Sequence, residues 1–270
     1  MNATLEDIAG SDGTYHTAPR KLSAWARAFP SLSFYRRFIS IILGSASQAK
    51  QNRFSASQWC RSSLDILLAL EQVGVSFNIS GITHLRGLQS PCVVVANHMS
   101  VLETVVLPGL VLPHLEFTFV VKESLLRYPV FKHVVRSRDP ITVGRSNPRA
   151  DLQAVLTGGV DRLSRGISVI VFPQTTRTHR LDPAEFNSIG VKLARKANVP
   201  VVPLALKTDA WGEGKLAKDF GKIDHTKTAR FAFGSPLEIR GRGGQEQQQI
   251  IDFITQRLQA WREPDPAHEV

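Results

Sequence analysis

Two hydrophobic patterns divide the chain. Between residues 22 and 73, apolar residues recur at helical spacing with arginines between them, as in Trp25, Phe29 and Phe38. From residue 75 onward, short runs of β-branched residues alternate with longer stretches of helical spacing. Helical spacing predicts amphipathic helices, and short β-branched runs predict buried strands. The chain is therefore expected to begin with helices and to continue as an α/β region.

The α/β region can be divided into individual elements. Strands are expected at 75–79, 92–96, 117–121, 141–143, 168–172, 201–206 and 230–233, and helices at 103–110, 148–164, 187–197 and 246–261. Strands that alternate with helices favour an α/β fold, with a layered, largely parallel sheet flanked by helices. We divide the chain into a polar leader with amphipathic helices (1–74), an α/β domain (75–240) and a C-terminal helix with a tail (241–270).

The N-terminal helices allow two interpretations. The second helical piece, around Trp59 and Leu64, is best interpreted as packing on the core. For the first piece, with Trp25, Phe29 and nearby arginines, core packing and insertion into a membrane headgroup layer fit equally well. The apolar run 38–44 is far shorter than the roughly 20 residues that a membrane span needs. We therefore expect any membrane contact to be peripheral.

Charge and cysteine content narrow the possible partners. The 33 Lys and Arg against 23 Asp and Glu give a net charge of +10, which favours an anionic partner. The basic residues are scattered and form no recognised nucleic-acid module, so we expect an acidic lipid surface or a phosphorylated substrate and no nucleic acid. Cys60 and Cys92 lack the companions of a metal site, so we expect no metal and a reducing cytoplasm.

The stretch from Val93 to Thr104, VVVANHMSVLET, carries the candidate chemistry. His98 follows a predicted strand and precedes a predicted helix, where α/β folds place their ligands. Glu103, one turn into that helix, can fix the imidazole tautomer and leave the other nitrogen free as a base. The competing interpretation is purely structural, because Ser100 and Glu103 also form a capping-box pattern.

Four segments, in order, are similar to one known family. NHMSVLE (97–103) resembles the Asn-His-x-Ser-x-x-Asp motif of the glycerolipid acyltransferases of the 1-acylglycerol-3-phosphate acyltransferase type. Residues 122–145 resemble the stretch that runs into the second motif of that family. VIVFPQTTRT (169–178) looks like its Phe-Pro-Glu-Gly-Thr-Arg-Ser motif, and VPVVPLALK (199–207) resembles its fourth motif. The resemblance covers about residues 75 to 240.

The resemblance implies a role for each matching residue. His98 would be the base, Glu103 its partner, and Lys122 a cation for the oxyanion, although an exposed lysine that starts a loop fits Lys122 equally well. The implied substrate-binding residues are Asn97, Ser100, Arg145, Gln174, Thr175, Thr176 and Arg177. Arg136, Arg138 and Arg149 lie near Arg145, and any of them could take its place.

Three positions depart from the motifs. Glu103 replaces the usual aspartate, a change that keeps the carboxylate. Gln174 and Thr175 stand where Glu-Gly is usual, so the third motif loses a charge and gains bulk. The acceptor is therefore left open, and it need not be a glycerophosphate.

The resemblance implies an enzyme that moves a fatty acyl group from acyl-CoA or acyl carrier protein to a lysophospholipid hydroxyl. It implies no bound cofactor, and it places the protein on the cytoplasmic face of a membrane. A catalytically inactive lipid-binding homologue is the non-enzyme alternative. A hydrolase would normally need a Gly-x-Ser-x-Gly elbow, which the sequence lacks.

Overall fold

The computed structural model describes residues 12–129, 131–174, 176–215 and 217–262. The strands are β1 (Tyr15–His16), β2 (Ser76–Ser80), β3 (Val93–Ala96), β4 (Phe117–Lys122), β5 (Ile141–Val143), β6 (Ser168–Val171), β7 (Val201–Lys207) and β8 (Thr228–Phe233). The α-helices are α1 (Ala24–Ala28), α2 (Pro30–Lys50), α3 (Ala56–Glu71), α4 (Thr83–Arg86), α5 (Val101–Val111), α6 (Phe131–Arg136), α7 (Pro148–Ser164), α8 (Ile189–Ala197) and α9 (Gly244–Ala260).

The described strands form one sheet in the order β1-β2-β8-β7-β3-β6-β4-β5. Pairing is parallel except where β1 meets β2 and where β7 meets β8. The prediction of a largely parallel sheet flanked by helices is therefore confirmed. Strand β3 lies between β7 and β6, and each of these runs parallel to it. Their carboxyl ends therefore meet at one edge of the sheet, next to the end of β3.

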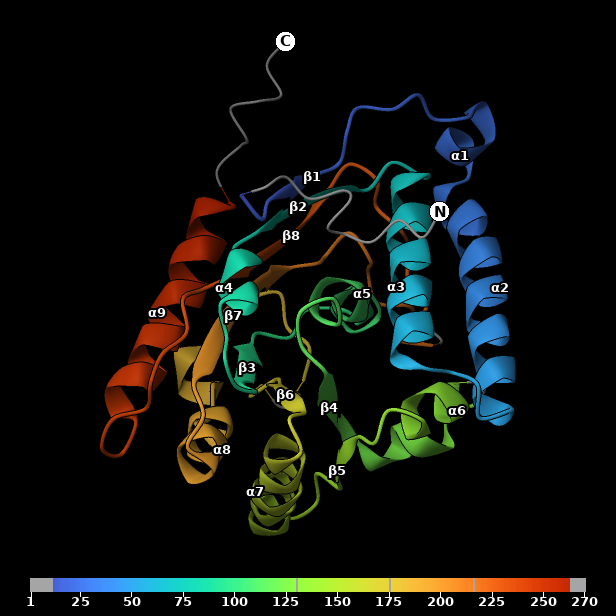
Figure 1. Ribbon diagram of the computed structural model, residues 1–270. Coiled ribbons are helices and arrows are strands. Elements are labelled where there is room, and N and C mark those ends of the chain that lie inside the picture. The colour runs from blue at the N-terminus through green and yellow to red at the C-terminus, as the bar shows by residue number, and fades with distance from the viewer. Residues whose placement is uncertain (1–11, 130, 175, 216, 263–270) are drawn as a thin grey trace.

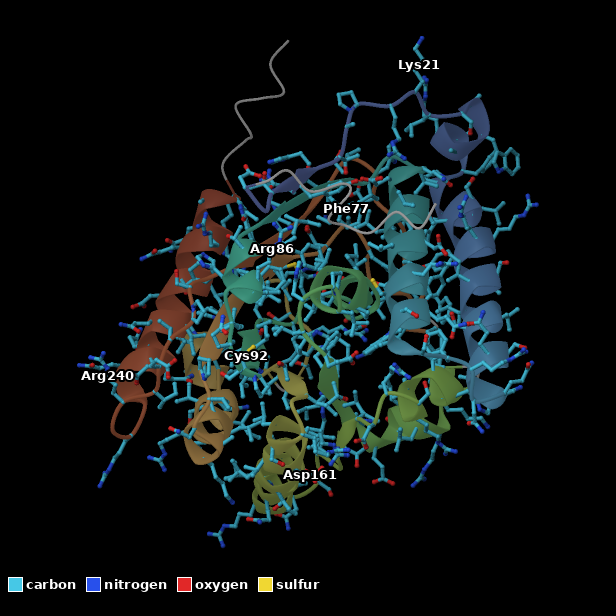
Figure 2. All side chains as sticks on the ribbon, in the orientation of Figure 1. Lys21, Phe77, Arg86, Cys92, Asp161 and Arg240 are labelled. Atoms are coloured by element: carbon cyan, nitrogen blue, oxygen red, sulfur yellow. The ribbon has the colours of Figure 1, made fainter. Side chains whose placement is uncertain are left out.

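Helices cover both faces of the sheet, with α2, α3 and α5 on one side and α7, α8 and α9 on the other (Figure 1). Alternating residues of β3 point into the two hydrophobic cores, one on each face of the sheet. Val94 and Ala96 pack with the first group of helices, and Val93 and Val95 pack with the second. Cys92, at the start of β3, lies within the mass of side chains in Figure 2 and is fully buried. Burial raises the pKa of its thiol to about 12, so Cys92 is a neutral core residue.

The leader differs from the expectation. Residues 1–11 lie outside the described part of the chain, but β1 pairs antiparallel with β2. The buried carboxylate of Glu71, at the end of α3, accepts hydrogen bonds from the Tyr15 hydroxyl (2.5 Å) and the Thr17 hydroxyl (2.6 Å). Arg20 adds an ion pair to Glu71 at 2.9 Å. These contacts join residues 12–20 to the sheet edge and to α3, which the polar sequence of the leader did not indicate.

Helix α5 is interrupted by Pro108, which has no N–H to donate within the helix. Ser63 of α3 binds the helix next to this interruption, because its hydroxyl accepts from the Gly109 N–H at 2.8 Å and donates to the Val105 carbonyl at 2.7 Å. A Cβ on Gly109 would lie 2.8 Å from the Leu64 side chain, so glycine lets the two helices approach closely. Helix α5 begins beside the motif of residues 97–103, and this contact fixes its position.

We predict that Ser63→Ala destabilises the protein by about 1–3 kcal/mol, because it leaves the buried Gly109 N–H without an acceptor. Urea unfolding measures the change. Ser62→Ala is the matched control, since the Ser62 hydroxyl bonds only the Trp59 carbonyl of its own helix; its effect should stay within about 0.5 kcal/mol. Equal stability of the two variants would contradict the proposed role of Ser63.

Candidate active site

The motif residues lie in the loop that joins β3 to α5. Asn97 ends the strand and binds the backbone of β7 twice, donating to the Leu206 carbonyl and accepting from the Leu206 N–H, both at 2.8 Å. Its side chain is buried. This pair of bonds fixes the chain at the point where it turns out of the sheet. The next residue, His98, is thereby directed out of the carboxyl edge of the sheet.

His98 and Glu103 are in direct contact. The imidazole Nδ1 lies 2.8 Å from Glu103 Oε1, with the histidine side chain 12% exposed and the glutamate fully buried. Ser100 caps α5, and a capping box with Glu103 is present. The predicted capping box and the predicted contact with His98 are therefore both present, because one carboxylate caps the helix and binds the histidine. With Nδ1 engaged, Nε2 is the nitrogen left for chemistry.

The carboxylate of Glu103 is surrounded by donors. The backbone N–H of Met99 donates to it at 2.7 Å, the backbone N–H of Ser100 donates at 3.0 Å, and the Thr208 hydroxyl donates to Oε2. Burial alone would raise the pKa of Glu103, but the hydrogen bond and charge of His98, with these donors, more than offset it. The pKa of Glu103 therefore lies below its ordinary value, and the carboxylate is ionised at neutral pH.

A second loop holds the other side of His98. The Gln174 side-chain oxygen accepts the His98 backbone N–H at 2.7 Å, and the Thr178 N–H donates to the His98 carbonyl at 3.0 Å. The Phe172 ring stacks on the imidazole with centroids 4.5 Å apart. The third motif therefore positions His98 through backbone bonds and ring stacking. Gln174 needs only its side-chain oxygen for this contact, so the loss of the usual charge leaves it intact.

His98 opens into a cavity of about 1480 Å³. One part of its wall is apolar and runs from His98 along stacked rings, with Phe172 and Phe119 6.1 Å apart and Trp59 edge-on to Phe119. Phe38 and Ile42 of α2 and Ile66 of α3 continue this wall. The cavity therefore provides a long apolar surface that starts at the imidazole.

The cavity lining also carries several cations, and one of them, Arg138, lies over the ring of Trp59. The basic residues that line the cavity are Lys122, Arg138, Arg145, Arg177, Lys192 and Lys218, against the acidic Asp151, Glu213 and Asp219. Arg177 forms an ion pair with Asp219, Nη1 to Oδ1, at 2.6 Å. Arg145 adopts a left-handed backbone conformation (φ 63°), and its N–H donates to Asp151 at 2.9 Å. An amphiphile with an anionic head fits a cavity of this composition.

The predicted site residues fall into three groups. His98, Lys122, Arg145, Gln174, Thr176 and Arg177 line the cavity, and so does Arg138, which the sequence left as an alternative to Arg145. Asn97 and Ser100 are buried and do not line it; their polar atoms bind the backbone of residues 206 and 208 instead. Thr175 lies outside the described residues.

Three residues that contribute to the site were missed in the sequence. Phe172, Thr208 and Asp219 all act through contacts between distant segments. Phe172 and Thr208 carry a local signal, because Phe172 ends a predicted strand within the third motif and Thr208 follows a predicted strand, whereas Asp219 carries none. Across the described ranges, no group of three His, Cys, Asp or Glu side chains could hold a metal ion.

Comparisons with known proteins agree on one family. The sequence model of the Acyltransferase family matches residues 76–207. The chain is 30% identical over 240 residues to a 1-acyl-sn-glycerol-3-phosphate acyltransferase of Pseudomonas aeruginosa, a match that covers 89% of this chain and 85% of that protein. It is also 30% identical to a chloroplast enzyme of the same name from Brassica napus, over 52% of this chain and 38% of that protein.

A solved structure shares the fold. The crystal structure of a 1-acyl-sn-glycerophosphate acyltransferase from Thermotoga maritima superimposes with a TM-score of 0.67 at 16% identity, covering 88% of this chain and 97% of that one. At this identity the similarity shows the fold alone.

The buried charge of Glu103 predicts a pH dependence of stability. The pKa of Glu103 is lowered in the folded state from the ordinary glutamate value of 4.5. Its contribution to stability is therefore present above the unfolded pKa and is lost as pH falls through the folded pKa. We expect the difference in the free energy of unfolding between wild type and Glu103→Gln to shrink below about pH 4.5, by at most about 1.4 kcal/mol per pH unit. Urea unfolding between pH 7 and 3 measures it. A constant difference over this range would show that the carboxylate keeps an ordinary pKa.

Proposed function

Because the chain belongs to the acyltransferase family that includes the 1-acyl-sn-glycerol-3-phosphate acyltransferases, we propose that it transfers a fatty acyl group from an acyl thioester to the free hydroxyl of a lysophospholipid. Its membership makes it an O-acyltransferase of phospholipid synthesis. The donor in this proposal is acyl-CoA or acyl-acyl carrier protein. 1-Acylglycerol 3-phosphate is the first acceptor to consider, since it is the acceptor in the names of the relatives.

The observation that carries the proposal is the His98–Glu103 pair, whose histidine lines a cavity that combines stacked aromatic rings with several cations. An acyl chain suits the apolar wall along Phe172 and Phe119. A phosphate-bearing head suits the cations of the lining, such as Arg177. Both substrates would then present their reacting groups to the same imidazole.

The proposed reaction uses His98 directly, without a covalent enzyme intermediate. Nε2 of His98 accepts the proton of the acceptor hydroxyl while the hydroxyl oxygen attacks the thioester carbonyl carbon. Glu103, ionised and buried, stabilises the imidazolium that forms. The tetrahedral intermediate then collapses, the carbon–sulfur bond breaks, and the thiolate takes the proton from Nε2. Lys122 lines the same cavity and supplies a cation for the oxyanion.

The alternative is a catalytically inactive lipid-binding homologue, for which the altered third motif is the best support. The contact between Gln174 and the His98 backbone weakens this alternative. With glutamine at position 174, His98 is still held by backbone hydrogen bonds on both sides. We therefore favour the enzyme.

We predict that the wild-type protein releases thiol from acyl-CoA or acyl-acyl carrier protein only when a lysophospholipid is present. His98→Ala should lower the rate by about a hundredfold to ten-thousandfold, because the base is lost. A thiol-trapping dye follows the reaction, and mass spectrometry identifies the acylated product. His84→Ala, on α4, is the matched control and should retain the rate. Thiol release without an acceptor would indicate a thioesterase, and no release with any donor or acceptor would favour the inactive homologue.

We further propose that the enzyme works at the cytoplasmic face of an anionic membrane, held there by α1 and α2. Large apolar side chains project outward along these helices: Trp25, Phe29, Leu32, Ile39 and Leu43 are between 47% and 60% exposed. Trp25 lies on α1 and Phe29 at the break between the two helices, while within α2 a spacing of seven and then four residues places Leu32, Ile39 and Leu43 on one helical face. The opposite face, with Phe34 and Phe38, packs on the core. Among the described helices, none is long and apolar enough to cross a bilayer.

We predict that replacing Leu32, Ile39 and Leu43 together by serine lowers binding to vesicles of phosphatidylglycerol and phosphatidylethanolamine by roughly tenfold or more. The reason is that these apolar side chains are lost from the interface with the membrane. Vesicle sedimentation measures the binding. Ser47→Gln, an exposed polar change on the same helix, should bind as the wild type does. Undiminished binding of the triple variant would exclude this face.

A further inference from the structure

The ion pair between Arg177 and Asp219 is the feature of the cavity that the proposed reaction leaves unused. Asp219 lies in the loop between β7 and β8, a segment that none of the sequence motifs covers. The Arg177 side chain is 21% exposed and that of Asp219 is 34% exposed, and both line the cavity. Arg177 is adjacent in sequence to Thr178, whose N–H binds the His98 carbonyl. The pair therefore lies beside the reacting centre.

The loop holds Asp219 in place. The indole N–H of the buried Trp211 donates to the Asp219 carbonyl at 3.1 Å, and the Gly212 N–H donates to the Lys222 carbonyl at 3.0 Å. A Cβ on Gly221 would lie 1.9 Å from the Gly212 carbonyl oxygen, so the two sides of the loop pack backbone against backbone.

The same loop is tied to α2. The Tyr35 hydroxyl donates to the Gly221 carbonyl at 2.5 Å, and the Ile223 N–H donates to the Ser31 hydroxyl at 3.0 Å. A loop fixed from two sides gives the Asp219 carboxylate a defined position, which distinguishes this pair from an ordinary surface ion pair.

The Asp219 carboxylate affects how strongly Arg177 can bind an anion. A guanidinium offers five N–H donors, and Asp219 occupies the Nη1 end of Arg177, which leaves the other donors for a ligand. A phosphate bound there lies within a few ångström of a fixed negative charge. The repulsion is proportional to the charge of the ligand, so a dianionic phosphomonoester is penalised more than a monoanionic phosphodiester.

We propose that Asp219 is a specificity-determining residue. Its negative charge lowers the affinity of the cavity for dianionic phosphomonoester heads more than its affinity for monoanionic phosphodiester heads. This inference rests on the proposed function, because it takes the Arg177 side of the cavity as the place of the acceptor head. Asp219 touches no reacting atom in this role and acts only on head-group selection.

The test compares kcat/KM for two short-chain, water-soluble acceptors, 1-hexanoylglycerol 3-phosphate and 1-hexanoylglycerol 3-phosphoglycerol, so that vesicle binding does not enter. Asp219→Asn should raise the ratio of the first to the second by roughly tenfold, the effect of one unit charge at this separation in a half-exposed site. Asp219→Glu keeps the charge and should leave the ratio near that of the wild type. Asp224→Asn removes a charge near the end of the same loop, outside the cavity lining, and should change the ratio less than twofold.

An unchanged ratio in Asp219→Asn would overturn the proposal. An equal fall of kcat/KM for both acceptors would overturn it too, because Asp219 would then only position Arg177. Inorganic phosphate gives a second readout that does not depend on turnover: by titration calorimetry it should bind Asp219→Asn roughly tenfold more tightly than the wild type. If the wild type transfers no acyl group, the proposed function fails, and the phosphate titration still decides the role of Asp219.

Discussion

The site depends on burying the carboxylate of Glu103. A fully buried charge is tolerated only when donors surround it, and here they come from two parts of the chain: the loop after β3, which supplies backbone N–H groups and the imidazole of His98, and Thr208 just after β7. These segments must meet at one edge of the sheet for the charge to be stable. The requirement that keeps Glu103 ionised therefore also places His98, and catalytic geometry and fold stability are linked through one side chain.

The surrounding fold supports this arrangement from both faces. Helix α5 carries Glu103 and is held against α3 by Ser63, whose hydroxyl accepts the Gly109 N–H next to the interruption at Pro108. Strand β7 is tied to the end of β3 by Asn97. Because β3, β6 and β7 run in the same direction, the loops after all three strands lie next to His98. A single cavity can therefore join the apolar rings along β4 to the cations at the strand ends.

The departures from the family motifs can now be interpreted physically. Glu103 is longer than an aspartate, and its extra methylene still allows the capping box and the contact with His98. Gln174 supplies a neutral oxygen where the family usually has a carboxylate. The His98 backbone N–H still donates a hydrogen bond to this oxygen. The third motif therefore contributes no carboxylate at position 174, whereas Asp219 forms an ion pair with Arg177.

Sequence alone was sufficient for the features that depend on local patterns. Hydrophobic runs located the strands from β2 to β8 within a few residues, and the spacing of Ser100 and Glu103 predicted the cap, because these signals arise from periods of two and 3.6 residues along one chain. The pairing of His98 with Glu103 also followed from a separation of five residues. Tertiary structure alone decided the docking of the leader through Glu71, the ring of Phe172 on His98, the bond from Thr208 to Glu103, and the placement of Asp219 on Arg177. Each of these contacts joins segments between about 40 and 110 residues apart. No local period carries information over such separations, since they are set by the order and direction of the strands in the sheet.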